Sequence, residues 1–226
     1  MGVLETLTRI VQLGGVAARA PRVAGMRADF EARTGAFSPE DPWFEERSRA
    51  FWCDAVTAGR FGREVAAELT DDERAWLAPL ERAHRGLFRA AGAASDEGDV
   101  LVDVWSGAEL AVSLLDEASR AELDAGAGQL FDARVVGCDE PFVVALLPGA
   151  VFHPRDATAA IEPVLAAARA RRLPTGDTLD ALLRMQRTLR SLSRVKAAYA
   201  YRPDALSPQA PAVPHVPVRR AAKPPT

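Results

Sequence analysis

Lysine, cysteine and histidine are scarce in this chain of 226 residues. It contains two lysines, Lys196 and Lys223, against 26 arginines, together with two cysteines, Cys53 and Cys138, and three histidines. Two cysteines are too few for a disulfide scaffold or a thiolate zinc module, and they favour a reducing compartment. The shortage of lysine excludes a phosphate-binding P-loop, which needs a lysine after its second glycine.

Long apolar runs are also missing. No stretch approaches the eighteen or so apolar residues that a membrane span requires. The composition is 48% apolar and 26% charged with a net charge of -3, which excludes collagen-like, rod-like and wholly disordered chains. We therefore expect a globular cytoplasmic protein that does not enter a membrane.

The first ninety residues carry helix signals. Ser38-Pro39-Glu40-Asp41 offers a cap hydroxyl followed by proline, and Thr70-Asp71-Asp72-Glu73 is a capping box. These patterns predict helices beginning near residues 39 and 71, the second continuing through His84, Leu87 and Phe88 at helical spacing. Residues 1–90 are thus expected to form a helical bundle.

The periodicity then changes to that of strands. Four segments are rich in β-branched residues, and short turns join them in pairs. They are residues 100–105, 108–114, 129–136 and 141–147. This pattern predicts a small antiparallel sheet or half-barrel of about four strands within residues 99–147, with a strand-rich region 99–152 and one short helix at 116–125.

Helical spacing resumes after the strands, over 156–172 and over 178–201. The fold class is therefore predicted as α+β and mainly helical, with residues 1–202 forming one globular domain. Seven prolines fall between residues 203 and 226, at every third position from Pro208 to Pro217. Such a segment cannot pair its backbone regularly, so 203–226 is predicted to be a disordered basic tail, with a docking peptide for an aromatic groove as the alternative.

Charge is distributed unevenly along the chain. Residues 169–202 contain nine basic and two acidic side chains, whereas the chain as a whole is acidic. Four arginines fall on one face of the predicted 178–201 helix: Arg184, Arg187, Arg190 and Arg194. We call them the arginine stripe. Three alternatives follow for its counter-charge: the acidic N-terminal region of the same chain, a protein partner with an acidic surface, or nucleic-acid phosphates. Nucleic acid is the less favoured external partner because the chain is acidic and carries no recognisable reading motif.

Two further groups of residues bear on function. Trp43, next to Pro42, should point away from the face that Phe44, Phe51 and Trp52 share, where it could anchor a partner; packing of all four aromatic residues in the core is the alternative, and the favoured one. A cysteine-dependent hydrolase would need Cys138 within hydrogen-bond reach of His153. No metal-site spacing or cofactor motif occurs, so no metal or cofactor is expected. The sequence thus favours a non-catalytic adaptor or regulatory protein-binding module using the stripe, Trp43 and the tail, ahead of a nucleic-acid-binding accessory protein and of a hydrolase.

Overall fold

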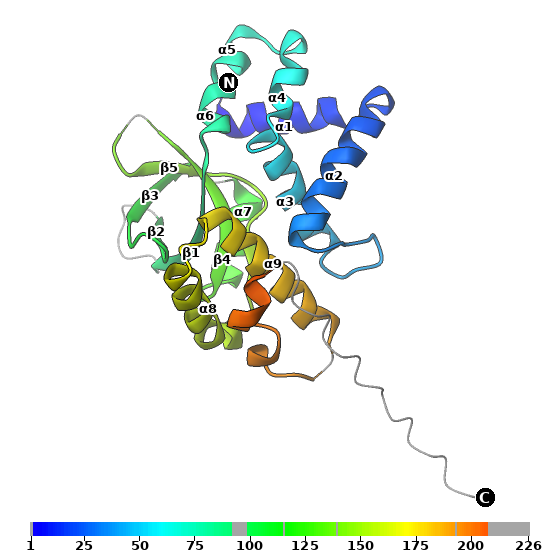
Figure 1. Cartoon of the computed structure of the whole chain (residues 1–226). Coiled ribbons are helices and arrows are strands. Elements are labelled where there is room, and N and C mark those ends of the chain that lie inside the picture. Colours follow the sequence, from blue (N-terminus) through cyan, green and yellow to red (C-terminus); the bar gives the residue numbers. More distant parts are fainter. Residues whose placement is uncertain (1, 92–98, 115, 139, 193, 208–226) are drawn as a thin grey trace, which may run out of the picture.

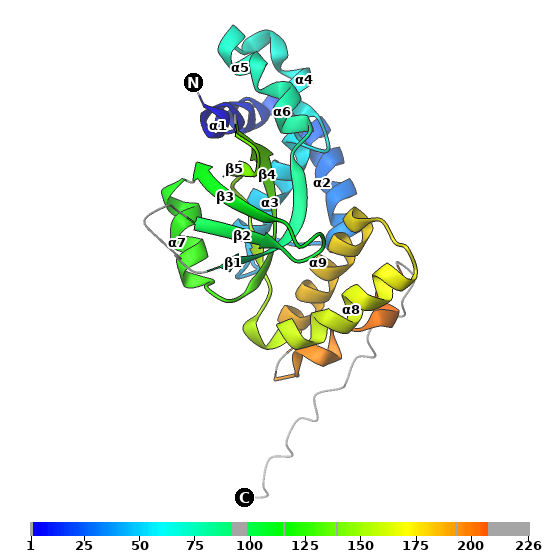
Figure 2. The ribbon, with the colours of Figure 1, turned by 90° about the vertical axis from the view of Figure 1, so that its left-hand side faces the viewer.

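The fold is α+β, as the sequence predicts, with a β-barrel between two groups of helices (Figures 1 and 2). The computed structural model describes residues 2–91, 99–114, 116–138, 140–192 and 194–207. The N-terminal helices lie against one side of the barrel, and two long C-terminal helices pack against another. None of the helices within these residues combines the length and the apolar character needed to cross a membrane.

The N-terminal helices pack through apolar stripes. In the first of them, Val3, Leu7 and Ile10 are buried on one face. The predicted start near residue 71 is confirmed, because the Thr70 hydroxyl accepts the Glu73 N–H at 3.3 Å and the Glu73 carboxylate accepts the Thr70 N–H at 2.7 Å. The helix bounds are Val3–Gly14 (α1), Ala20–Thr34 (α2), Phe44–Val56 (α3), Phe61–Glu64 (α4), Asp71–Ala75 (α5) and Leu77–Glu81 (α6).

The helix predicted to begin near residue 39 begins at Phe44. Residues 38–41 form a turn in which the Asp41 N–H donates to the Ser38 carbonyl at 2.9 Å and the Asp41 carboxylate accepts the Ser38 N–H at 2.8 Å. Pro42 explains the error, since the residue before a proline is pushed out of the helical region. The prediction for this start was wrong, and the turn places Trp43 at the entry of α3.

The sheet closes on itself. The strand order is β1-β2-β3-β5-β4, and a second pairing between β1 and β4 completes a five-stranded barrel, while β6 extends the pairing along β4. A helix, α7 (Glu117–Ala125), connects β3 to β4, and β3 runs parallel to β5. The result is a closed five-stranded barrel that contains one parallel pair of strands. The strand bounds are His84–Ala91 (β1), Asp99–Asp103 (β2), Glu109–Leu114 (β3), Leu130–Gly137 (β4), Val143–Leu146 (β5) and Val151–Phe152 (β6).

All four predicted strands are present, and there are two additional ones, β1, which closes the barrel, and the short β6. The segment His84–Ala91 was predicted as helix and is strand, so that prediction was wrong. It contains no β-branched residue, yet it pairs with β4 from His84 to Arg89 and with β2 from Phe88 to Ala91. Pairing on both edges outweighs the weak local preference of these residues.

The C-terminal helices α8 (Thr158–Ala170) and α9 (Thr175–Ser191) cover the barrel beside the N-terminal group (Figure 2). The helix predicted to run to residue 201 ends at Ser191, so that boundary was wrong. The chain then returns as two short 3-10 turns, η4 (Ala197–Tyr199) and η5 (Pro203–Leu206), which pack on α8 and α9.

The segment 203–207 is therefore part of the folded body, which corrects the predicted start of the tail at 203. Leu206 is buried in the same apolar cluster as α8 and α9. Residues 208–226, which hold the rest of the predicted tail, lie outside the described residues.

Candidate functional site

The arginine stripe lies against the turn that follows α2. Arg184 donates to the Arg33 carbonyl and Arg187 to the Ala36 carbonyl, both at the C-terminal end of α2 or just beyond it. The helix ends at Thr34, so no following helical N–H donates a hydrogen bond to either carbonyl. The two guanidinium groups donate these hydrogen bonds instead. Two of the four arginines thus tie α9 to α2 within the chain.

The other two arginines have different environments. Arg190 forms an ion pair with Glu46 of α3 and also donates to the Phe152 carbonyl at 3.4 Å. Arg194 lies beyond the end of α9, at a left-handed backbone position with φ 58°, and it is exposed. No ion pair or hydrogen bond joins it to another described residue. The four arginines are therefore not one free cationic face.

Trp43 and Arg190, two of the predicted binding residues, share one groove. Its volume is about 520 Å³, and the Arg190 guanidinium carbon lies 5.9 Å from the centre of the Trp43 ring. Trp43 is half-buried, and its ring N–H has no acceptor within the described residues. The residues that line the groove are Pro42, Trp43, Glu45, Glu46, Arg49 and Arg190. We call it the Trp43 groove.

Ion pairs neutralise the two cations of the Trp43 groove. Glu46 pairs with Arg190 and also accepts the Phe152 N–H at 3.0 Å, while Arg49 pairs with Glu122 of α7. Glu45 is exposed and has no ion pair within the described part of the chain. Glu45 is therefore the one charged residue lining the groove that has no ion pair within the described residues, and its charge is negative.

The barrel fixes the position of α3, which carries most of this groove. Gly149, in the loop between β5 and β6, has a φ of 104°, and a Cβ built on it would lie 2.7 Å from the Arg49 carbonyl oxygen. Only glycine fits this approach without strain. The loop thus packs backbone to backbone against α3 at the residue whose side chain lines the groove.

A chain of ion pairs joins the barrel to the helices; its carboxylates, Arg85 and Arg134 are buried, whereas the Arg33 side chain is 42% exposed. Arg33 bridges Asp54 and Asp180 at 2.6 and 3.0 Å, and Arg85 bridges Asp180 and Asp132 at 2.6 Å each. Arg134 of β4 completes the chain through Asp54. Its members come from α2, α3, β1, β4 and α9, so one network connects both groups of helices to the barrel.

The ion pairs outweigh the effect of burial on Asp180. Burial by itself disfavours the charged form of Asp180, but Arg85 and Arg33 more than compensate and hold its pKa below the ordinary range. Three arginines face three aspartates, so the network is electrically balanced. This balance indicates a structural role, because no charge remains for a ligand.

His153 is fully buried next to this network. Its Nδ1 lies 2.7 Å from the Tyr201 hydroxyl oxygen, and Nε2 has no partner within the described residues. Burial lowers the pKa of His153 to about 4, so the ring is neutral at pH 7. Tyr201 precedes η5, and this contact therefore holds the last described segment against β6.

Cys138 and His153 lie at opposite ends of β4. The His153 N–H donates to the carbonyl of Leu130, the first residue of β4, whereas Cys138 follows the last residue, Gly137. The eight residues of β4 separate the two positions by roughly 25 Å at the usual rise of a strand. Cys138 instead contacts the Ser113 hydroxyl, with 3.3 Å between sulfur and oxygen. The pair that the hydrolase hypothesis needs is not formed.

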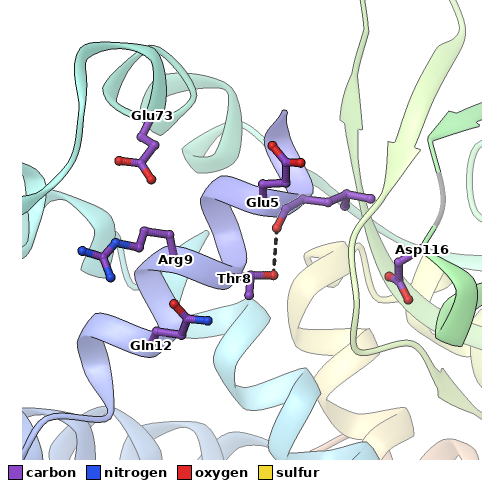
Figure 3. A pocket seen from close by; sticks show the side chains of 7 residues that line it. Glu5, Thr8, Arg9, Gln12, Glu73 and Asp116 are labelled. Atoms are coloured by element: carbon purple, nitrogen blue, oxygen red, sulfur yellow. Dashed lines mark hydrogen bonds between the residues drawn. The ribbon is translucent and has the colours of Figure 1, made fainter. Parts of the chain in front are cut away.

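A second depression, of about 380 Å³, lies along the polar face of α1 (Figure 3). Figure 3 shows Arg9 on the side of α1 that faces Glu73 of α5, with Asp116 across the depression. Glu73 closes the capping box of α5, and Asp116 caps α7 by accepting the Ser119 N–H at 2.9 Å. Because both carboxylates hold helix ends, we assign this depression a structural role.

Phe142 is an exposed aromatic residue that the sequence did not single out. Its side chain is 69% exposed, and its backbone adopts a φ of 63°, a left-handed position that bulky residues rarely occupy. It follows Pro141 in the turn between β4 and β5, beside a depression of about 390 Å³ lined partly by Val135 and Leu110. Among the described residues, Phe142 is the most exposed large apolar side chain, and it provides a control for the Trp43 groove.

Two strands of the barrel lack the residues that bind nucleic acids. Nucleic-acid-binding surfaces supply cations for the phosphates and aromatic rings that stack on the bases. In this chain β2 reads Asp-Val-Leu-Val-Asp and β3 reads Glu-Leu-Ala-Val-Ser-Leu, with no arginine, lysine or aromatic residue. The barrel therefore adds no support to the nucleic-acid alternative.

Comparisons with protein-family models, with curated proteins and with solved structures give no significant match for this chain. The described residues contain no group of three or more histidine, cysteine, aspartate or glutamate side chains placed to hold a metal ion. Glu45, Glu46 and Arg49 are the groove residues that the sequence did not indicate. Their helical spacing places them near one another, but nothing local reveals that Arg190 completes the groove.

Proposed function

We propose that this protein is a non-catalytic adaptor or regulatory protein-binding module, and that the Trp43 groove is its binding surface. The observation that carries the proposal is the position of Trp43, a half-buried aromatic side chain in the wall of a groove whose rim is charged. A central aromatic anchor within a polar rim is the usual composition of a protein-binding hot spot.

The structure changes the chemistry expected of the partner. The prediction of an acidic partner depended on free arginines, and Arg184, Arg187 and Arg190 each have an acceptor within the chain. Glu45 is the uncompensated charge at the groove. The partner segment that fits is therefore apolar enough to pack on Trp43, and neutral or basic where it passes Glu45.

The test places a photo-cross-linking residue at position 45 of the full chain in its native cells and identifies what it captures. A cross-linker at Glu109, on the exposed face of β3, is the matched control. The captured partner is then purified, and its affinity for Trp43→Ala is measured. Loss of a hot-spot tryptophan removes at least about 2 kcal/mol, so Kd should rise about thirtyfold or more.

Other results distinguish the alternatives. If Phe142→Ser weakens binding and Trp43→Ala does not, the partner binds the barrel end and the groove assignment is wrong. If the captured molecule is RNA or DNA, the runner-up function is supported. A log–log salt slope of about -3 needs four phosphate contacts, so it would mean that Arg184, Arg187 and Arg190 leave their acceptors within the chain on binding.

A further inference from the structure

The Trp43 groove and the proline-rich segment of the same chain have complementary chemistry. Prolines recur at every third residue from Pro208 to Pro217, and Arg219, Arg220 and Lys223 follow. The groove offers Pro42 and Trp43 as an apolar wall and Glu45 as an unpaired acid. We propose that residues 208–226 bind the Trp43 groove of their own chain, the prolines on Trp43 and the arginines near Glu45.

The spacing of the prolines suits an aromatic wall. Three residues complete one turn of a polyproline II helix, so prolines at every third position share one edge. Segments of this kind bind aromatic-lined grooves because the extended conformation is preformed and little entropy is lost on binding. The exposed part of the half-buried Trp43 ring supplies this wall, whereas its ring N–H is buried and makes no contact with the segment.

Charge fixes the direction in which the segment lies. Arg49 and Arg190 are neutralised by Glu122 and Glu46, which leaves Glu45 free to pair with a basic group. The basic residues follow the prolines in the sequence, so Pro211–Pro217 would lie on Trp43 and Arg219 and Arg220 would pass Glu45. A segment bound in the reverse direction would bring its uncharged half to Glu45.

The folded body delivers the segment near the groove. Tyr201 is hydrogen-bonded to His153, the residue directly after Phe152, and the Phe152 N–H donates to Glu46 in the groove wall. From Ser207 onward, ten residues of polyproline II helix extend about 30 Å. Attachment to the same chain also gives an effective concentration on the order of millimolar, so a weak contact is sufficient for occupancy.

This inference rests on the proposed function, because it identifies a ligand for the same groove. In that case the segment competes with an external partner, and the partner must displace it to bind. The full chain then binds its partner more weakly than a chain whose segment has lost its basic residues. The test of the inference nevertheless needs no partner.

The experiment uses the full chain with Cys138→Ser and Ala212→Cys, labelled at residue 212 with a nitroxide. Cys53 is fully buried and its burial raises its thiol pKa to about 11, so it does not take up the label. We expect the label to broaden the NMR signal of the Trp43 ring N–H and to leave that of Trp76, between α5 and α6 at the far end of the molecule, unchanged (Figure 1). An unbroadened Trp43 signal would overturn the proposal.

Charge reversal tests the direction. Glu45→Arg should remove the broadening, and adding Arg219→Glu with Arg220→Glu should restore it, while Glu109→Arg should have no effect. A mixture of isotope-labelled chain without nitroxide and unlabelled chain with nitroxide separates the two sources of the segment. Broadening that appears in the mixture shows that the segment comes from a second copy, and it would overturn binding within one chain.

The two proposals fail in different ways. If Trp43 is not broadened but cross-linking at residue 45 still captures a partner, the groove binds a partner and not the segment. If Trp43 is broadened and no partner is captured, the intramolecular contact stands and the adaptor function does not.

Discussion

At the scale of single residues, burial decides which side chains are available for chemistry. His153, Cys53 and Arg47 are all buried. Burial lowers the pKa of His153 and Arg47 and raises that of Cys53, and in each case it favours the neutral form of the side chain. Arg47 has a pKa lowered to about 10, and two of its guanidinium nitrogens have no partner within the described residues. These three side chains lie inside the fold, where a ligand does not reach them. Trp43 is half-buried and Glu45 is exposed, so a ligand can contact both.

The buried histidine makes stability depend on pH. Below pH 6.5 the unfolded chain protonates His153, whereas the folded chain keeps the ring neutral until about pH 4. The unfolded state therefore binds more protons in this window, and the free energy of unfolding should fall by up to about 3 kcal/mol as pH drops from 6.5 to 4.

Urea unfolding at a series of pH values measures this dependence. The variant His153→Gln should show a flatter profile over the same window, whatever its stability at pH 7. The carboxylates with lowered pKa values, such as Asp180, contribute at more acidic pH than the histidine does. Profiles of equal slope in the two proteins would contradict a buried, neutral His153.

At the scale of elements, chain segments with weak local signals are positioned by packing. The 3-10 turn η5 is an example, because four residues starting with proline have little structural preference of their own. Leu206 in this turn is 4% exposed and contacts the cluster formed by α8 and α9. The turn η5 therefore packs in the core, although the sequence predicted that the disordered tail begins at Pro203.

Truncation of Leu206 tests this assignment. Leu206→Ala removes a buried side chain and leaves a cavity, so we expect a loss of about 2–3 kcal/mol in the free energy of unfolding. Ser207→Ala, at the neighbouring exposed position, should change it by less than about 0.5 kcal/mol. Thermal and urea denaturation of both variants measure the difference. Equal stabilities would show that residues 203–207 do not contribute to the core.

At the scale of the whole molecule, the buried ion pairs join three parts of the fold. Arg85 of β1 is the central member, since it binds Asp132 of β4 and Asp180 of α9. Without Arg85, Asp132 loses its ion pair and Asp180 keeps only the one with Arg33. We expect Arg85→Met to lower the free energy of unfolding by about 3–5 kcal/mol.

The exposed pair between Arg120 and Asp99 provides a matched control. The Arg120 side chain is 58% exposed, so Arg120→Met should cost less than about 1 kcal/mol. Adding Asp132→Leu to Arg85→Met removes one unpaired charge and should recover part of the loss. If Arg85→Met unfolds at the same urea concentration as the original chain, the network does not stabilise the fold.

The sequence by itself determined the features that local chemistry controls. The capping box at Thr70 placed the start of α5, and the β-branched residues placed four strands, because neither depends on distant parts of the chain. The apolar side of α9, with Leu182 and Met185, was likewise readable from helical spacing. The fold class followed from these elements.

Only the tertiary structure decided how these elements meet. The β1 segment becomes a strand through its pairing on two edges, and α9 ends at Ser191 without a glycine or proline there to stop it. The partners of Arg187 and Arg190 lie about 150 residues away in the sequence. A pattern of charges shows that counter-charges are needed, but not where they lie. The Trp43 groove exists because Arg190 of α9 pairs with Glu46 of α3, a contact between distant segments that local spacing does not encode.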